Sequence, residues 1–211
     1  MIVDCHAHVI EHWMGPCGHP TRDIHRKYLQ RMLVHTVASV YRTRDGAPAD
    51  TKALLDPKDM GWSGLRAVDF RVGRFGRLEF TADGEDYYAQ YMPVGMQEMV
   101  APPDLMLAQM TYAGVDHAVL QAGGAYGAMT SYNCYTSIQY PTKFTALLHV
   151  DEAMGGTPAG VAEVERGAKL GAKGLYFNFE GFARHGFPWP LDHANMDPLW
   201  DRLQASRLVL C

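Results

Sequence analysis

The chain has 211 residues and a formal net charge of −4, with 47% hydrophobic and 20% charged residues. Such a composition is typical of a folded globular protein and excludes disorder over most of the chain. The negative charge, without any Lys/Arg-rich run, argues against nucleic-acid binding and against an anionic membrane partner.

Targeting signals and cysteines bear on where the protein works. No basic, leucine-rich leader precedes the first apolar segment, and no apolar run approaches the roughly 18 residues that a bilayer span needs. Reduced thiols in a cytoplasmic protein are the expectation, because the cysteines are widely spaced and form no CxxC pair. The four cysteines are Cys5, Cys17, Cys134 and Cys211.

The opening segment, residues 2–10, is apolar and β-branched apart from a few polar positions, and it predicts a buried strand. Side chains alternate between the two faces of a strand, so Asp4, His6 and His8 are expected on one face. Two imidazoles about 7 Å apart along a strand can converge on one divalent cation. We therefore predict His6 and His8 as metal ligands, with Asp4 beside a ring or the metal. The alternative is a His-x-His pair that is only hydrogen-bonded within an ordinary strand.

Two further segments precede a regular pattern. Residues 42–101 are rich in Gly, Pro, Asp and Arg, and the turn at Ala82-Asp83-Gly84 between alternating runs predicts a hairpin. We interpret 42–101 as a small inserted β-hairpin and loop subregion. Residues 20–41 are predicted to be helical, with one possible face formed by Ile24, Tyr28, Met32, His35 and Ser39.

The remainder of the chain alternates strands with helices. Strands are expected near residues 2, 116, 144, 173 and 207, and helices follow Pro102, Thr130, Thr157 and Asp197. This rhythm predicts βαβ units and a parallel sheet. A complete (β/α)8 barrel needs about 250 residues, so 1–211 is interpreted as one partial TIM-barrel domain holding the first five strands. An open five-stranded α/β sheet is the alternative.

Several segments resemble one enzyme family: MIVDCHAHV, GVDHAVLQAG, FTALLHVDEA, GAKGLYFNFEG and MDPLWDRLQASRLVLC. Over residues 1–12 and about 102–211 the chain resembles the amidohydrolase-related (amidohydrolase 2) group of the amidohydrolase superfamily. That group includes metal-dependent hydrolases and non-oxidative decarboxylases of aromatic or enol carboxylic acids.

The resemblance implies a barrel with one divalent metal, Zn²⁺ or else Mn²⁺, at the carboxyl ends of the strands. His6 and His8 match the first-strand ligand pair. Some members of the superfamily bridge two metals with a carboxylated lysine from strand four. Lys173 begins strand four rather than ending it, which favours one metal over two. In many members a histidine at the end of strand five is the next metal ligand, and an aspartate at the end of strand eight binds the metal or serves as the catalytic base. The catalytic base is therefore expected beyond Cys211, and the chain as given is expected to bind metal weakly and not to turn over.

Four other residues are candidates for a substrate pocket. His149 ends strand three and Asn178 ends strand four, while Arg184 and His185 follow in a loop where they would meet an anionic substrate. The alternatives are a satisfied core histidine for His149 and solvated loop side chains for Arg184 and His185.

Four readings of function remain open. The first is hydrolysis of a small carbonyl or amide substrate through a metal-activated water. The second is decarboxylation of an aromatic or enol acid. The third is a non-catalytic, degenerate barrel, and the fourth is a TatD-like nuclease, which the acidic charge disfavours. The expected partner is a small-molecule substrate. A homodimer, in which a second copy of the chain is the partner, is also expected. Aromatic residues in the insertion suit a planar substrate or simple core packing: Trp62, Phe75, Tyr87, Tyr88 and Tyr91.

Overall fold

The computed structural model describes residues 1–35, 39–59, 61–124 and 126–211. The chain divides into two compact units. The first unit is Met1–Val9 with Ala101–Cys211, and the second unit is Ile10–Val100. The predicted subregion, 42–101, falls within the second unit except for Ala101.

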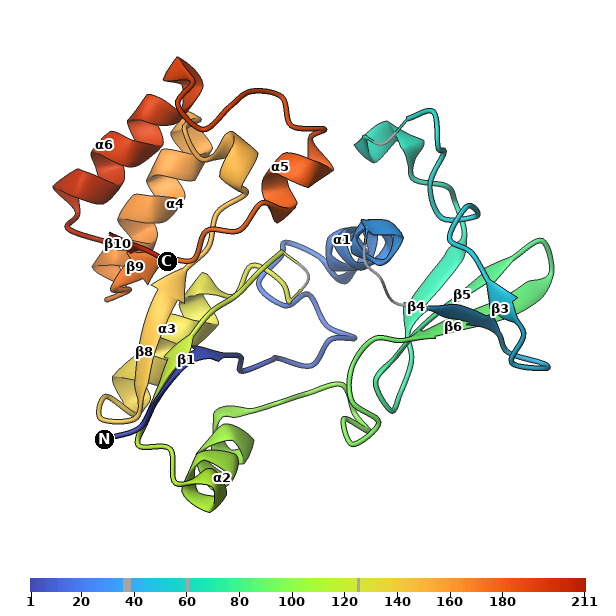
Figure 1. Cartoon of the computed structure of the whole chain (residues 1–211), viewed down its shortest axis with the longest axis horizontal. Helices are drawn as coiled ribbons and strands as arrows, with labels where there is room; N and C mark the ends of the chain where they lie inside the picture. The colour runs from blue at the N-terminus through green and yellow to red at the C-terminus, as the bar shows by residue number, and fades with distance from the viewer. Residues whose placement is uncertain (36–38, 60, 125) are drawn as a thin grey trace. The chain divides into compact units, whose positions relative to one another are not determined.

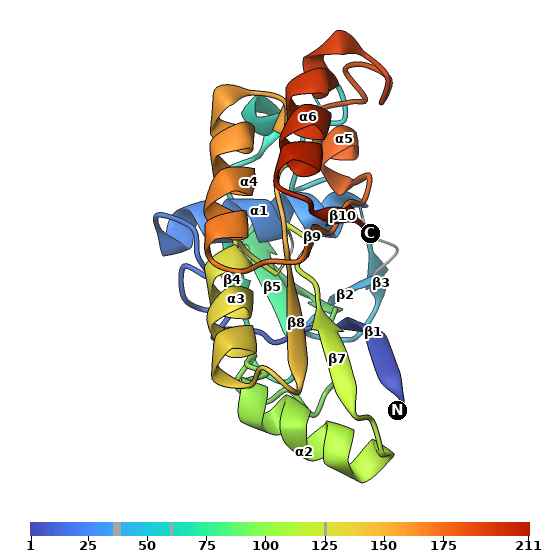
Figure 2. The ribbon, with the colours of Figure 1, turned by 90° about the vertical axis from the view of Figure 1, so that its left-hand side faces the viewer.

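The first unit contains a five-stranded parallel sheet whose strands lie side by side in chain order. Right-handed crossovers between strands taken in this order place the connecting helices on one face, as in a βα-barrel. Figure 2 shows α3 and α4 along one face of this sheet. The fold is therefore mixed α/β with a singly wound parallel sheet; its closure into an eight-stranded barrel stays a prediction. The strands, in sheet order, are β1 (Val3–Ala7), β7 (His117–Leu120), β8 (Phe144–Leu148), β9 (Gly174–Leu175) and β10 (Val209–Leu210).

The helices predicted between these strands are confirmed, with clear end signals. Gly114 ends the first of them in the left-handed region at φ 71°, and the side chain of Thr157 accepts from the N–H of Gly160. The last helix, expected to follow Asp197, begins at Asp197 itself, with Met196 at the N-cap position. The helices are α2 (Pro103–Ala113), α3 (Thr130–Gln139), α4 (Pro158–Lys169), the unpredicted α5 (Glu180–Arg184) and α6 (Asp197–Ala205). Two single-turn 3₁₀ segments accompany them, Glu152–Met154 and Ala194–Met196.

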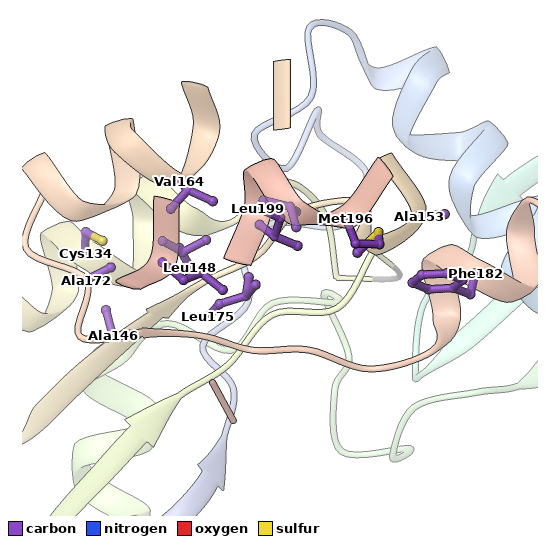
Figure 3. Close-up of a cluster of buried hydrophobic side chains, with 12 residues drawn as sticks. Cys134, Ala146, Leu148, Ala153, Val164, Ala172, Leu175, Phe182, Met196 and Leu199 are labelled. Carbon is purple, nitrogen blue, oxygen red and sulfur yellow. The ribbon is translucent and has the colours of Figure 1, made fainter. Parts of the chain in front are cut away.

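The main core of the first unit lies between its helices and strands β8 and β9. Helices α4 and α6 run side by side (Figure 1), and Val164 and Leu199 meet Leu148 between them and the sheet (Figure 3). A Cβ at Gly167 would lie 2.7 Å from a methyl carbon of Leu148, so α4 packs on β8 as closely as glycine allows. Burial of apolar side chains in this cluster supplies the main stabilisation of the layer. Its buried members are Cys134, Ala146, Leu148, Val150, Ala153, Val164, Ala172, Leu175, Phe182, Met196, Leu199 and Leu203.

The prediction that the opening strand is buried is wrong for its first part. Residues Val3 to His6 are exposed, and only Ala7 of β1 is buried. The physical reason is that β1 lies at one edge of the sheet and pairs with β7 alone. Ala7 and Val9 join Leu120 in a smaller apolar cluster.

The second unit combines one helix with an antiparallel sheet. Helix α1 (Arg22–His35) is shorter than predicted: Val40–Arg42 forms a strand, and residues 36–38 lie outside the described residues. Its buried apolar residues are Leu29, Met32 and Leu33. Of the predicted face Met32 is buried, whereas Ile24 and His35 are exposed, so that prediction is wrong in part. The strands, in sheet order, are β3 (Pro48–Ala49), β2 (Val40–Arg42), β6 (Glu85–Gln90), β5 (Arg77–Ala82) and β4 (Asp69–Val72), with a 3₁₀ turn at Trp62–Gly64.

The hairpin about the Asp-Gly pair is present between β5 and β6. Asp83 and Gly84 have φ of 51° and 76°, the left-handed backbone that a two-residue turn requires. Aromatic residues of this unit pack on one another: Tyr87 stacks on Phe80, with ring centroids 5.0 Å apart. None of the helices in the described ranges is long and apolar enough to cross a membrane.

Candidate active site

Polar side chains gather where the parallel strands of the first unit end. The carboxyl ends of parallel strands share one edge of a sheet, and sites of βα folds lie there. We call this the carboxyl edge. Its polar and aromatic members lie at the ends of four strands: His6 in β1 and His8 directly after it, Gln121 and Tyr126 after β7, His149, Asp151 and Glu152 after β8, and Tyr176, Asn178 and Glu180 after β9.

A β-bulge shapes the strand that carries the two histidines. Asp4 pairs with Ala118 and Ala7 with Leu120, so β1 holds one extra residue between these pairs. The strict alternation expected from Asp4 to His8 therefore does not hold. The Asp4 carboxylate accepts a hydrogen bond from the backbone N–H of His6 at 2.9 Å. Asp4 thus supports the bulged backbone, and its place beside a metal stays a prediction.

Gln121 braces this bulge from the neighbouring strand. Its side-chain amide donates to the carbonyl of Cys5 at 2.6 Å, and its backbone N–H donates to the carbonyl of Ala7 at 2.9 Å. Its own carbonyl lies 2.9 Å from Nδ1 of His8. A carbonyl can only accept, so Nδ1 of His8 carries the proton and Nε2 carries the lone pair.

The two histidine rings lie next to each other among aromatic side chains. The ring centroids of His6 and His8 are 4.8 Å apart in an edge-to-face arrangement. Tyr126 stacks on His8 at 4.3 Å, and Tyr176 meets His6 edge-on at 5.7 Å. Burial lowers the pKa of His8 from 6.5, against the opposing effect of its hydrogen bond to Gln121. His8 is therefore neutral near pH 7, the form in which imidazole binds a metal.

The two histidines meet part of what a divalent cation needs. Neutral imidazole is a preferred ligand of zinc, and a carbonyl that holds the far nitrogen is the usual support for such a ligand. Among the residues that the structure describes, no group of three or more His, Cys, Asp or Glu side chains is arranged to hold a metal. The pair therefore fits two ligands of a metal, short of the three that catalytic zinc sites use.

A second group of charged side chains lies beyond β8. Asp151 Oδ2 is 3.1 Å from Nε2 of His185 and 3.6 Å from the guanidinium of Arg184. Arg184 also pairs with Glu180 at 3.2 Å, and its side chain is 3% exposed. Arg184 is thus a buried helical residue with its charge matched by two carboxylates, not a solvated loop residue.

His149 and Glu152 form a deeper contact. Nε2 of His149 is 3.4 Å from Oε1 of Glu152, and both side chains are buried. Glu152 also accepts hydrogen bonds from the backbone N–H groups of Gly181, at 2.7 Å, and Asn178, at 3.4 Å. A Cβ at Gly181 would lie 2.1 Å from Glu152 Oε2, so only glycine allows this approach. This contact fixes the start of α5 against the end of β8.

The structure brings the predicted pocket residues to the same edge. Asn178 accepts from the N–H of Glu180 at 2.9 Å, and its amide nitrogen lies 3.4 Å from where a Cβ on Gly123 would be. Their role as a substrate pocket stays a prediction. Sequence reasoning missed Gln121, Tyr126, Asp151, Tyr176 and Glu180. Their position is the signal that identifies them as candidates, because each lies in a predicted strand or within a few residues after its end.

Comparisons with known proteins give structural likeness alone. No protein-family model matches the chain, and no curated protein matches it. It is similar to a 5-carboxyvanillate decarboxylase from Novosphingobium aromaticivorans, solved with bound manganese, at 20% identity and TM-score 0.38, over 50% of this chain and 32% of that chain. It is also similar to a probable 2-pyrone-4,6-dicarboxylic acid hydrolase from Acinetobacter baumannii, solved with citric acid, at 16% identity and TM-score 0.42, over 58% of this chain and 41% of that chain.

A further similar structure is the 5-carboxyvanillate decarboxylase of Sphingomonas paucimobilis, at 24% identity and TM-score 0.39, over 49% of this chain and 33% of that chain. The chain thus covers between 32% and 41% of the length of these three solved structures. The carboxyl edge itself carries the functional proposal.

Proposed function

We propose that the carboxyl edge is the active-site edge of a divalent-metal-dependent enzyme of the amidohydrolase superfamily. His6 and His8 bind the metal, Zn²⁺ or Mn²⁺, and the reaction is hydrolysis of a small carbonyl or amide substrate. The observation that carries the proposal is the adjacent pair of rings, with Nδ1 of His8 held by the Gln121 carbonyl.

The chemistry of the residues supports this assignment. Bound at the pair, a divalent cation supplies Lewis acidity toward a carbonyl and an activated water. Tyr126 stacks on the His8 ring and the Gln121 carbonyl holds its Nδ1, while Tyr176 meets the exposed His6 ring edge-on. The orientation of the His8 ring is therefore set before any ligand arrives, which lowers the entropic cost of binding.

The four proposed pocket residues contribute differently. Asn178 and His185 are partly exposed and are the groups that a substrate meets, whereas His149 and Arg184 are buried. An anionic substrate that binds Arg184 has to compete with Asp151 and Glu180. A neutral carbonyl compound avoids this competition, which favours the hydrolytic reading.

Metal binding is the first test. Zn²⁺ and Mn²⁺ are titrated separately into protein stripped of metal, with the heat of binding as the readout. We expect one divalent ion per chain, and we expect His6→Ala or His8→Ala to lower the affinity at least about tenfold, because each removes a ligand. The matched control is His117→Gln, a histidine at the opposite end of the same sheet that bonds to Thr145 and Thr142. Wild-type protein without measurable binding, or ligand variants that bind like wild type, contradicts the proposal.

Turnover is the second half of the test. Metal-loaded protein is given phenyl acetate, whose hydrolysis releases phenol and acetate, and separately salicylate, whose decarboxylation releases phenol and CO₂. Turnover of either compound replaces the expectation, drawn from the family resemblance, that the chain as given is inactive. Phenol release from phenyl acetate that is lost in His6→Ala supports hydrolysis. CO₂ from salicylate without ester hydrolysis replaces hydrolysis by the decarboxylase reading. Metal binding without either reaction supports the non-catalytic reading.

A further inference from the structure

Two histidine–carboxylate contacts follow strand β8, and they differ in exposure. In the pair His149–Glu152 the side chains are 8% and 0% exposed. In the pair His185–Asp151 they are 25% and 22% exposed, and Nε2 of His185 lies 3.1 Å from Oδ2 of Asp151. In the buried pair Glu152 already accepts from two backbone N–H groups, and neither side chain is open to a ligand. The partly exposed pair is the one that a small molecule can reach.

Asp151 fixes the chemical form of the His185 ring. A carboxylate accepts, so the proton of neutral His185 is on Nε2 and the lone pair is on Nδ1. Arg184 stands on the other side of the same carboxylate oxygen at 3.6 Å and is held in turn by Glu180. The second oxygen of Asp151, Oδ1, is buried and has no hydrogen-bond donor within the described part of the chain. Buried oxygens of this kind need a donor, which a ligand or an ordered water supplies.

The pair lies on the same edge as the two proposed metal ligands. Strands β1 and β8 are separated by β7 alone, which places their ends about 10 Å apart at the usual strand spacing. Tyr126 stacks on His8, and burial, with smaller effects of Tyr176 and Glu180, raises the pKa of Tyr126. The same loop after β7 lies against Arg184, since a Cβ at Gly124 would be 2.6 Å from a guanidinium nitrogen, so this loop joins His8 to the Arg184–Asp151–His185 group.

We infer that His185, oriented by Asp151, is the general acid–base of this site, in place of the base that the family resemblance puts beyond Cys211; the inference rests on the proposed hydrolytic function. The step is a proton transfer with no change of oxidation state. Nδ1 of His185 takes one proton from the attacking water as its oxygen bonds to the substrate carbonyl carbon. The same nitrogen returns that proton to the leaving oxygen or nitrogen as the bond to carbon breaks. One water is consumed, and the histidine ends neutral.

The test separates proton transfer from a purely structural ion pair. His185→Gln keeps an amide N–H for Asp151 and removes only the titratable nitrogen. We expect this variant to lower kcat for phenyl acetate by roughly 10²–10⁴-fold and to remove the histidine limb of the pH–rate profile. We expect metal affinity to stay within about twofold, because His185 is not a proposed metal ligand, and we expect the loss in kcat to exceed any change in KM by far, because the removed nitrogen acts in the chemical step. Imidazole added to His185→Ala is expected to restore part of the rate, while the control His117→Gln keeps the wild-type rate.

A second readout needs no turnover. Diethyl pyrocarbonate acylates the unprotonated nitrogen of histidine, and mass spectrometry locates the product. We expect His185 to be modified several-fold more slowly in Asp151→Asn than in wild type, because the amide no longer fixes the tautomer. His117 serves as the internal reference.

The outcomes are distinct. Metal-dependent turnover that persists at the wild-type rate in His185→Gln overturns the inference and leaves the proposed function standing. Loss of turnover without rescue by imidazole and with equal modification rates in Asp151→Asn also overturns it, since the pair is then structural. Wild-type protein with no metal binding or no hydrolysis overturns both.

Discussion

His8 acquires a defined chemical form from residues far away in the chain. The Gln121 carbonyl fixes its tautomer, Tyr126 fixes its plane, and burial lowers its pKa. His8 therefore takes up its second proton at a lower pH than a free imidazole does. No proton has to leave His8 when a metal binds near neutral pH.

The cysteines give a residue-scale prediction. Burial raises the pKa of Cys17 from 9.0 to about 12, and burial also raises that of Cys134, while Cys5 and Cys211 are exposed. Thiolate is the reactive form, so we expect 5,5′-dithiobis(2-nitrobenzoate) to label Cys5 and Cys211 in native protein at about pH 8 and all cysteines after denaturation.

The raised pKa of Cys17 also determines how the stability of the protein changes with pH. The folded-state pKa of Cys17 lies above its unfolded value, so its contribution is intact below pH 9.0 and is lost as pH rises toward 12. Urea unfolding of wild type and Cys17→Ala over this alkaline range measures it. Rapid native labelling of Cys17, or identical alkaline losses in the two proteins, contradicts the assignment.

At the scale of single elements, the start of α4 carries a capping signal that one substitution can test. The hydroxyl of Thr157 accepts from the N–H of Gly160 at 3.3 Å, and Pro158 is the first helical residue. We expect Thr157→Ala to lower the free energy of unfolding by about 1 kcal/mol, because the N-terminal N–H loses its acceptor. Urea denaturation measures the loss, and the exposed Thr142→Ala is the control. An equal effect of both substitutions contradicts the capping role.

Helix α5 has a different origin. It is only 5 residues long, too short to be stable by itself, and it contains Gly181. The buried Glu152 accepts from the N–H of Gly181, and Arg184 pairs with Asp151. Contacts with the loop after β8 therefore hold the helix in place, and no local pattern in the sequence predicts them.

At the scale of the whole first unit, the sheet has a protected centre and two edges. Strand β8 is paired on both sides and mostly buried, whereas β10 pairs with β9 alone and is exposed. We expect amide hydrogen exchange, followed by mass spectrometry, to be slowest in Phe144–Leu148 and fastest at Val209–Leu210. An unfolded sample gives the reference rates.

Protection of the edge strands tests the predicted homodimer. If β1 and β10 exchange slowly, and more slowly at higher protein concentration, a second copy covers an edge of the sheet. Concentration-independent exchange that is as slow in β10 as in β8 contradicts the sheet order described here.

The sequence by itself determined the alternation of strands and helices in the first unit, the Asp-Gly hairpin and the histidine pair. These features follow from neighbouring residues: hydrophobic periodicity, capping residues and the spacing of His6 and His8. Local patterns miss a bulge, because an extra residue in β1 is visible only against its partner β7.

Only the tertiary structure decided how the carboxyl edge is assembled. Gln121 reaches the carbonyl of Cys5, and Asp151 reaches His185, across long stretches of chain. Such contacts depend on which strands lie side by side, and this order is a property of the folded sheet. The sequence thus named the two histidines proposed as metal ligands, and the fold supplied the groups that orient His8 and the His185–Asp151 pair proposed as the acid–base.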